Sequence, residues 1–145
     1  MEIVGKGTGN DLLVELERPS GFLCATSKRY YKKLGKVLIT AQVLKRIHLP
    51  TLEMLSTNCA QWEFAVKEIN RKNKEKPGTG YVQVYQSKAT NISTELVLKR
   101  DAEKAMRDNI AAFGMDPQSE KKLKAATVDP NQGSLFNEFN NKQHG

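Results

Sequence analysis

The sequence predicts a mainly α protein, in which an antiparallel hairpin of two helices is followed by a third long helix. A short β-strand or β-hairpin is expected between the second and third helices. Apolar residues recur at steps of three or four in residues 30–44, 52–69 and 98–113, which is the spacing of one face of an α-helix. Alternation with period two occurs in Tyr81–Tyr85, a segment rich in β-branched and aromatic residues, and indicates a strand.

The first helix is expected to begin at Thr26 or Ser27, because either residue suits an N-cap. It should end near Ile47 and His48, since Pro50 disfavours helical geometry in the residue before it. The apolar face of this helix consists of Tyr30, Leu34, Val37, Leu38, Ala41 and Leu44.

The second helix is expected over residues 50–69, with fraying through 71–76. Pro50 fits a first helical position, where its missing N–H costs nothing. About three residues separate the two helices, so they should form an antiparallel hairpin whose shared face is the core. The apolar face consists of Leu52, Leu55, Cys59, Trp62, Val66 and Ile69.

A helix breaker, Pro77-Gly78-Thr79-Gly80, precedes the expected strand, and Gln86–Thr90 would turn the chain or return it. A lone β-hairpin is marginal in water, so it must dock on the helices or pair with another chain. Asn91 is the expected N-cap of the third helix, and Gly114 its left-handed stop. The apolar face of that helix consists of Leu98, Ala102, Met106, Ile110 and Phe113.

A chain of 145 residues is one domain, with or without tails. Residues 1–26 are expected to form a flexible N-terminal arm, and residues 27–127 a helical core and oligomerisation domain. Residues 128–145 are rich in Asn and Gln, so most of this tail is expected to be disordered. Its apolar residues have the spacing of one side of a helical turn, which suits either binding to a partner or packing on the chain's own domain. They are Leu135, Phe136 and Phe139.

Basic residues are concentrated in one segment. Seven basic residues and no acidic residue lie from Lys28 to Arg46, which equals the whole net charge of +7. This concentration indicates an anionic partner, most commonly nucleic acid. The alternative is a solvated helix face that only aids solubility. The expected DNA-binding residues are Lys28, Arg29, Lys32, Lys33, Lys36, Lys45 and Arg46.

The sequence favours binding and assembly over catalysis. No HExxH, CxxC or GxSxG motif occurs, no metal or cofactor is expected, and His48 is interpreted as a turn residue. No apolar run approaches the length of a membrane span, and no secretory signal is recognised. Cys24 and Cys59 are therefore interpreted as reduced thiols of a cytoplasmic protein, with Cys59 in the core.

Residues 39–54 offer a second way to bind DNA, because they could form a helix-turn-helix. The turn of that motif often contains glycine. Here Leu49-Pro50 stands in its place.

The third helix is followed by Phe113-Gly114-Met115-Asp116-Pro117-Gln118-Ser119-Glu120-Lys121-Lys122-Leu123. This segment resembles the aromatic-Gly-Leu-Thr-Pro-Ser-Ser-x-x-x-Leu signature of one family of phage terminase small subunits, and the likeness in helix order covers residues 28–124. The sequence departs from that family at Tyr30 or Tyr31, where Trp is usual, and at Glu53, where Asp is common. Lysine also replaces the arginine of the closing signature.

The resemblance implies a ring-forming protomer without enzyme activity of its own. Such a protein binds double-stranded viral DNA in the host cytoplasm and regulates the large terminase subunit, which holds the ATPase and nuclease, during genome packaging. A homo-oligomer ring needs heterologous contacts that close. Two alternatives remain open: a small dimeric helix-turn-helix DNA-binding regulator, and a scaffold or adaptor that does not contact nucleic acid.

Overall fold

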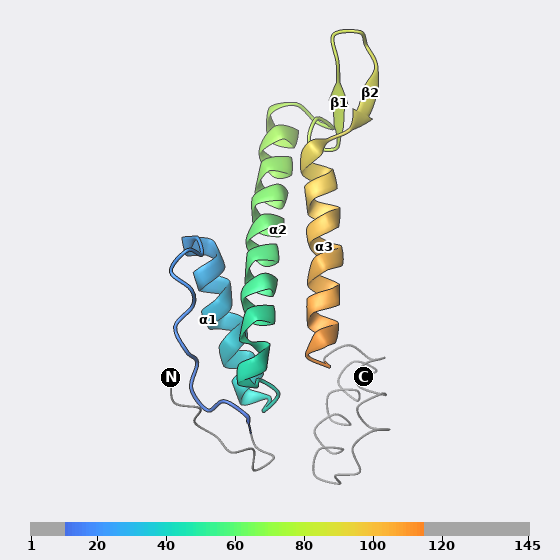
Figure 1. Ribbon diagram of the computed structural model, residues 1–145. Helices are drawn as coiled ribbons and strands as arrows, with labels where there is room; N and C mark the ends of the chain where they lie inside the picture. The colour runs from blue at the N-terminus through green and yellow to red at the C-terminus, as the bar shows by residue number, and fades with distance from the viewer. Residues whose placement is uncertain (1–10, 115–145) are drawn as a thin grey trace, which may run out of the picture. The chain divides into compact units, whose positions relative to one another are not determined.

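The computed structural model describes residues 11–114. The mainly α class is confirmed, with a two-stranded antiparallel sheet between the second and third helices (Figure 1). The chain divides into two units, Met1–Asn109 and Ile110–Gly145, and the packing described below is that of the first. In chain order the elements are α1 (Ala25–Thr40), the 3₁₀ turn η1 (Arg46–His48), α2 (Leu49–Glu75), β1 (Val82–Val84), β2 (Thr90–Ile92) and α3 (Thr94–Ala112).

Helices α1 and α2 run antiparallel and share an apolar seam (Figure 1). Tyr31 and Leu38 are buried on α1, and Leu52, Leu55 and Cys59 are buried on α2. Full burial of a leucine side chain stabilises the fold by about 1.5–3 kcal/mol. The helical hairpin predicted from the apolar spacing is therefore the core of this unit.

The start of α1 lies slightly before the predicted one. Cys24, not Thr26 or Ser27, is the N-cap, and its Sγ accepts a hydrogen bond from the backbone N–H of Ser27 at 3.4 Å. Ser27 is buried inside the first turn. One turn further on, Tyr31 rather than the expected Tyr30 is fully buried, and its hydroxyl donates to the backbone carbonyl of Glu17 at 2.9 Å.

The end of α1 differs more from the prediction, because the helix stops at Thr40 rather than near His48. Gln42 has a φ of 58°, and the backbone N–H of Val43 donates to the Leu38 carbonyl at 3.1 Å. This left-handed stop usually uses glycine, which the segment lacks. Residues 41–48, and not about three residues, consequently connect the two long helices.

Residues 11–24 lie along α1 and contact it (Figure 1). Leu12 forms an isolated antiparallel bridge with Lys45. A Cβ on Gly35 would lie 2.6 Å from a methyl carbon of Leu16, so glycine at this position lets the two segments approach closely.

Ser20 joins the same segment to α2. Its backbone N–H and its hydroxyl donate to the two carboxylate oxygens of Glu53 at 2.8 and 3.0 Å. Hydrogen bonds to a charged acceptor are stronger than those between neutral groups. Glu53 is therefore the main polar anchor between residues 11–24 and the helical hairpin.

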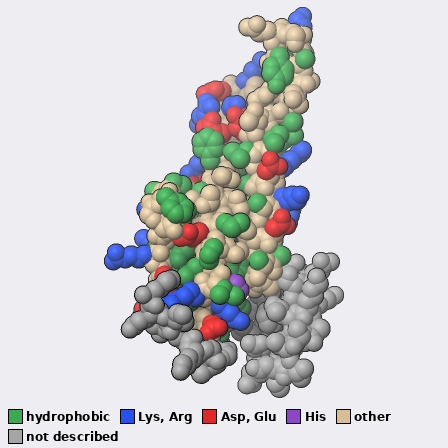
Figure 2. All heavy atoms as spheres, in the orientation of Figure 1, with side chains coloured by type: hydrophobic (Ala, Val, Ile, Leu, Met, Phe, Trp, Pro, Cys, Tyr) green, Lys and Arg blue, Asp and Glu red, His purple; other side chains and the backbone are tan. Residues whose placement is uncertain are grey.

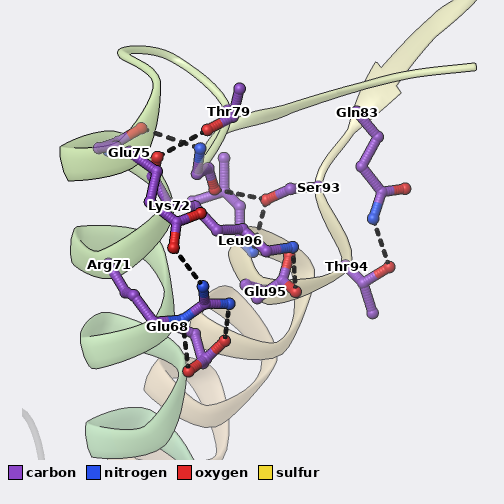
Figure 3. A network of polar contacts seen from close by, with 12 residues as sticks. Glu68, Arg71, Lys72, Glu75, Thr79, Gln83, Ser93, Thr94, Glu95 and Leu96 are labelled. Carbon is purple, nitrogen blue, oxygen red and sulfur yellow. Dashed lines mark hydrogen bonds and ion pairs between the residues drawn. The ribbon is translucent and has the colours of Figure 1, made fainter.

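The C-terminal end of α2 extends to Glu75, although residues 71–76 were expected to fray. Arg71 pairs with Glu68 and Glu75, three and four residues away, at 2.9 and 3.1 Å (Figure 3). The hydroxyl of Thr79 lies within hydrogen-bond distance of the carbonyls of Lys72 and Lys76, at 2.8 and 2.7 Å, and both carbonyls also accept a backbone N–H. These contacts stabilise the last turn of the helix. Helix propensities of single residues do not include such contacts, so they predict fraying here.

Gly80 and Ser93 hold the base of the β-hairpin in place between α2 and α3 through hydrogen bonds (Figure 3). The N–H of Gly80 donates to the Asn73 side chain at 2.8 Å, and the Ser93 hydroxyl donates to the Gly80 carbonyl at 2.6 Å. The same Ser93 oxygen accepts from the N–H of Leu96 at 3.1 Å. Ser93 is thus the N-cap of α3, and the predicted cap, Asn91, lies in β2 instead.

The strands β1 and β2 pair in antiparallel register, with Val82 opposite Ile92. Residues 85–89 form the connecting turn, in which Lys88 has a positive φ of 66°. The return strand left open by the sequence is therefore present. Gly114, with a φ of 70°, is the predicted left-handed stop after α3.

Polar side chains connect α2 with α3. Lys72 pairs with Glu95 at 2.6 Å, while the Trp62 indole N–H donates to Glu103 at 3.2 Å. A third contact joins the Asn58 and Asn109 side chains at 2.8 Å. Ala102 is the buried apolar residue of α3 within the first unit. The contact between these helices therefore relies on hydrogen bonds more than the α1–α2 seam does.

We expect Gly80→Ala to destabilise the fold by about 1–3 kcal/mol, the usual cost of overpacking. A Cβ at this position would lie 2.4 Å from the backbone oxygen of Ile69, which cannot move aside as a side chain can. Gly21→Ala is the matched control, because its Cβ would meet no atom within 4 Å. Denaturant unfolding at one protein concentration measures the free energy of unfolding of each variant. Equal values for the two variants would contradict this packing.

We expect Glu53→Ala to release residues 11–24 from the hairpin, because it removes both hydrogen bonds to Ser20. Hydrogen bonds to charged groups contribute about 1.5–3 kcal/mol, so amide exchange in the segment should accelerate at least tenfold. Glu68→Ala is the control, since Glu68 pairs within α2, with Arg71. Unchanged exchange in residues 11–24 of the Glu53 variant would show that Ser20 is not the anchor.

Candidate nucleic-acid interface

The basic segment is divided between two elements. Five of its residues lie on α1 at positions that share one helix face. Lys28, Lys32 and Lys36 follow each other at steps of four and form one ridge, with Arg29 and Lys33 beside it. A rise of 1.5 Å per residue puts about 12 Å between the first and last members of this ridge. We call these five residues the α1 basic face: Lys28, Arg29, Lys32, Lys33 and Lys36.

The apolar seam decides where the α1 basic face points. The side of α1 that packs against the rest of the unit is marked by its buried residues, which include Tyr31, Gly35 and Leu38. Lys28 follows the buried Ser27, and the other three lysines fall between Tyr31 and Leu38 in sequence, so the 3.6-residue period turns all four outward. The five basic residues and Ala25 line one shallow, open depression on α1.

Arg29 differs from the lysines because it is tied to α2. Its guanidinium lies 2.5 Å from the carboxylate of Glu63 and 4.8 Å from the centre of the Tyr30 ring. The Tyr30 hydroxyl donates to the same carboxylate at 3.2 Å, and Lys67 lies 3.5 Å from it. The hydrogen bond from Arg29 lowers the pKa of Glu63, so the charge of Arg29 is partly balanced at neutral pH.

The four lysines of the α1 basic face have no carboxylate partner among residues 11–114. All acidic side chains that form ion pairs in this part of the chain pair with other cations. Like charges four residues apart on a helix destabilise it by about 0.2–0.5 kcal/mol for each pair. An anion bound across the face would relieve that repulsion, which makes the four lysines the best-placed anion-binding group of the described chain.

Lys45 and Arg46 do not share this helix. They begin the η1 turn after α1, where Arg46 pairs with Glu17 at 2.9 Å. The backbone N–H of Lys45 donates to Nδ1 of His48 at 3.2 Å. Burial, together with the nearby charge of Lys45, lowers the pKa of His48. His48 therefore lies in a turn, as the sequence indicated.

Sequence reasoning did not identify Glu63 and Tyr30 as partners of Arg29. Glu63 lies 34 residues from Arg29, on the second helix of the hairpin. Only the helical phase of the two elements, combined with their antiparallel packing, brings the residues together. The sequence alone gave the phase of each helix but not the register between them.

Other chemistry has little support in the described residues. Within 11–114 no three His, Cys, Asp or Glu side chains are grouped so that they could hold a metal. The same residues include no helix that is long and apolar enough to span a membrane. Burial raises the pKa of Cys59, which lies in the seam as predicted, while hydrogen bonds from Ser27 lower the pKa of Cys24. The predicted partner-binding residues Leu135, Phe136 and Phe139 lie outside the described residues.

The helix-turn-helix expected over residues 39–54 differs from what is observed there. That motif joins two crossing helices by a turn of three or four residues. Here residues 41–48 separate α1 from α2, part of the connection is the η1 turn, and the two helices pack antiparallel (Figure 1). The local geometry does not favour this route to DNA.

A protein-family model described as "Phage terminase, small subunit" matches residues 27–130. The match begins in the first turn of α1 and includes both long helices, the β-hairpin and α3. Comparisons with curated proteins and with solved structures gave no match. Because the model covers more than half of the chain, the family is established. The chain belongs to the phage terminase small subunit family.

Proposed function

We propose that this protein is a non-catalytic small terminase subunit that binds double-stranded viral DNA through α1. It assembles into a homo-oligomeric ring and regulates the ATPase and nuclease of the large subunit during genome packaging. Family membership supports the role in phage DNA packaging. The observation that supports DNA binding is the set of four lysines on the exposed side of α1 that have no carboxylate partner within residues 11–114.

Charge density supports a duplex as the ligand. Double-stranded DNA carries one negative charge per about 1.7 Å of its axis, so the roughly 12 Å from Lys28 to Lys36 spans about seven phosphates. Lysine is a compact charge on a flexible stem and binds phosphate without fixed geometry. Contacts of this kind position the protein on DNA and do not read the sequence.

Assembly would multiply this contact. Each copy presents only a few cations, and a single helix face gives weak binding at physiological salt. When several copies are held in one ring, later contacts become intramolecular, and the total affinity rises without any new type of interaction. The mechanism therefore needs both the α1 basic face and self-association, with Leu135, Phe136 and Phe139 left to bind the large subunit.

We expect salt to weaken DNA binding steeply. Neutralising four phosphates per protomer gives a slope near −3.6 in log affinity against log salt, or about a hundredfold loss between 50 and 200 mM. Lys32→Ala and Lys36→Ala should each reduce that slope by about one for each protomer bound. Lys104→Ala, on the exposed side of α3, is the control and should leave it unchanged. Fluorescence anisotropy with a labelled duplex measures the affinity of the wild type and the three variants at each salt concentration.

Two outcomes of this titration would contradict the assignment. A flat salt response of the wild type would favour a scaffold or adaptor that does not contact nucleic acid. Equal losses in the Lys32, Lys36 and Lys104 variants would mean that the duplex senses only the net charge of +7 and not the α1 basic face.

We expect truncation after Ala126 to separate assembly from regulation. The shortened chain keeps the described helices but loses Leu135, Phe136 and Phe139. The truncated chain should assemble with the same number of subunits as the full chain. The ATPase rate of the large subunit in its presence should fall to near the unstimulated rate. Full stimulation by the truncated protein would remove the tail from the mechanism.

A further inference from the structure

The β-hairpin exposes apolar side chains that no other part of residues 11–109 covers. Val82 and Val84 are 44% and 69% exposed, and Tyr81 and Tyr85 are each 51% exposed. Residues two apart on a strand share a face, so the valines lie on one face of the sheet and the tyrosines on the other. The valine face is thus apolar, with Ile92 opposite Val82, whereas the tyrosine face also carries the Gln83–Asn91 pair. A two-stranded sheet with an exposed apolar face is marginal in water by itself.

The hairpin is also nearly free of charge. Lys88, in the turn, is the one charged residue from Tyr81 to Ile92, in a chain of which 27% is charged. On the face visible in Figure 2, the end of the molecule that Figure 1 assigns to the hairpin is green and tan with blue at its tip, and shows no red acidic side chain. Depletion of charge combined with enrichment in tyrosine is the composition of the central part of a protein–protein interface.

The outer edge of β1 is open for strand pairing at Val84, whereas at Val82 the backbone N–H donates to the Gly78 carbonyl at 3.1 Å. The Tyr81 carbonyl accepts from the N–H of Ser93, and the Tyr85 N–H donates to the carbonyl of Ala89, so both bond to residues that flank β2. Bonded positions alternate along an antiparallel strand, so the backbone groups of Val84 point to the outer edge. The edge of β2 is partly closed, because the N–H of Ile92 donates to the side chain of its neighbour Asn91 at 2.8 Å.

Nothing in the strands opposes edge-to-edge pairing. Natural proteins protect an exposed edge with charge, proline or a bulge. Neither Val82–Val84 nor Thr90–Ile92 contains a charged residue or a proline, and their register is regular. The base is fixed by Gly80 and Ser93, so the hairpin is held in place and not free to fold back (Figure 3). Such preorganisation lowers the entropy cost of association.

Charge argues that the partner is a second copy. Two copies of a chain with a net charge of +7 repel each other unless they meet through surfaces with little charge of their own. The α1 basic face cannot face itself, whereas the hairpin can. We infer that the β1–β2 hairpin is the self-association element, in which the β1 edge and the Val82–Val84 face pack on another copy of this chain. This inference rests on the proposed assembly and names the surface through which its subunits would contact each other.

Native mass spectrometry of the full chain tests the hairpin. Val84→Lys places a charge on the Val82–Val84 face and should raise the dissociation constant of the assembly at least about tenfold, so the fraction of single chains should exceed that of the wild type at each concentration. The substitution should fold normally, because Val84 is 69% exposed, and circular dichroism checks this. Phe64→Lys is the matched control: Phe64 is 59% exposed on α2, and this variant should remain assembled.

The possible results are distinct. A wild type that is a single chain at all concentrations would contradict the assembly itself. An assembled wild type with an equally assembled Val84→Lys variant would overturn only the role of the hairpin. Dissociation by Phe64→Lys instead would place the contact on α2, and dissociation by truncation after Ala126 would identify the tail as the occupant. Either of these results would also overturn the inference.

Discussion

The apolar seam between α1 and α2 is the constraint on which the other features depend. Tyr31 and Leu38 can be buried against Leu52 and Leu55 only if the opposite side of α1 faces water. The lysines are therefore displayed by the packing of a core and not by any interaction of their own. Each pair of neighbouring lysines costs about 0.2–0.5 kcal/mol, whereas the burial of a single leucine contributes about 1.5–3 kcal/mol. The fold can thus tolerate a charged face that is useful for binding an anion.

A second constraint is the polar contact that holds α2, the hairpin and α3 together. The backbone of Gly80 forms hydrogen bonds with the side chains of Asn73 and Ser93. Glycine is required at this position because the backbone oxygen of Ile69 would clash with a Cβ there. Without that anchor, a sheet with two strands would not keep its position. With it, the hairpin becomes a fixed projection with exposed valine and tyrosine side chains and with Lys88 as its one charged residue. The proposed DNA contact and the proposed self-association are in this way assigned to different elements.

Helical periodicity was enough to predict the fold class, the pairing of α1 with α2, and the outward direction of the α1 lysines. It failed where the chain used an unusual residue for a common geometry. Gln42 forms the left-handed stop of α1 without glycine, and Cys24 caps its start without a hydroxyl or carboxylate. Both substitutions are acceptable because packing and nearby hydrogen bonds compensate for a weak local preference. Contacts over long separations, such as Arg29 with Glu63, depend on the register between helices, which one sequence does not contain.

Protection of lysines from acetylation, with and without a duplex, measures most directly whether DNA lies on α1. Mass spectrometry reads the modification rate at each lysine of the full chain, so no residue has to be mutated. The account predicts that DNA slows modification of Lys28, Lys32, Lys33 and Lys36 several-fold more than that of Lys74 and Lys104. Protection that is uniform over all these lysines, or absent from the α1 basic face, would contradict it.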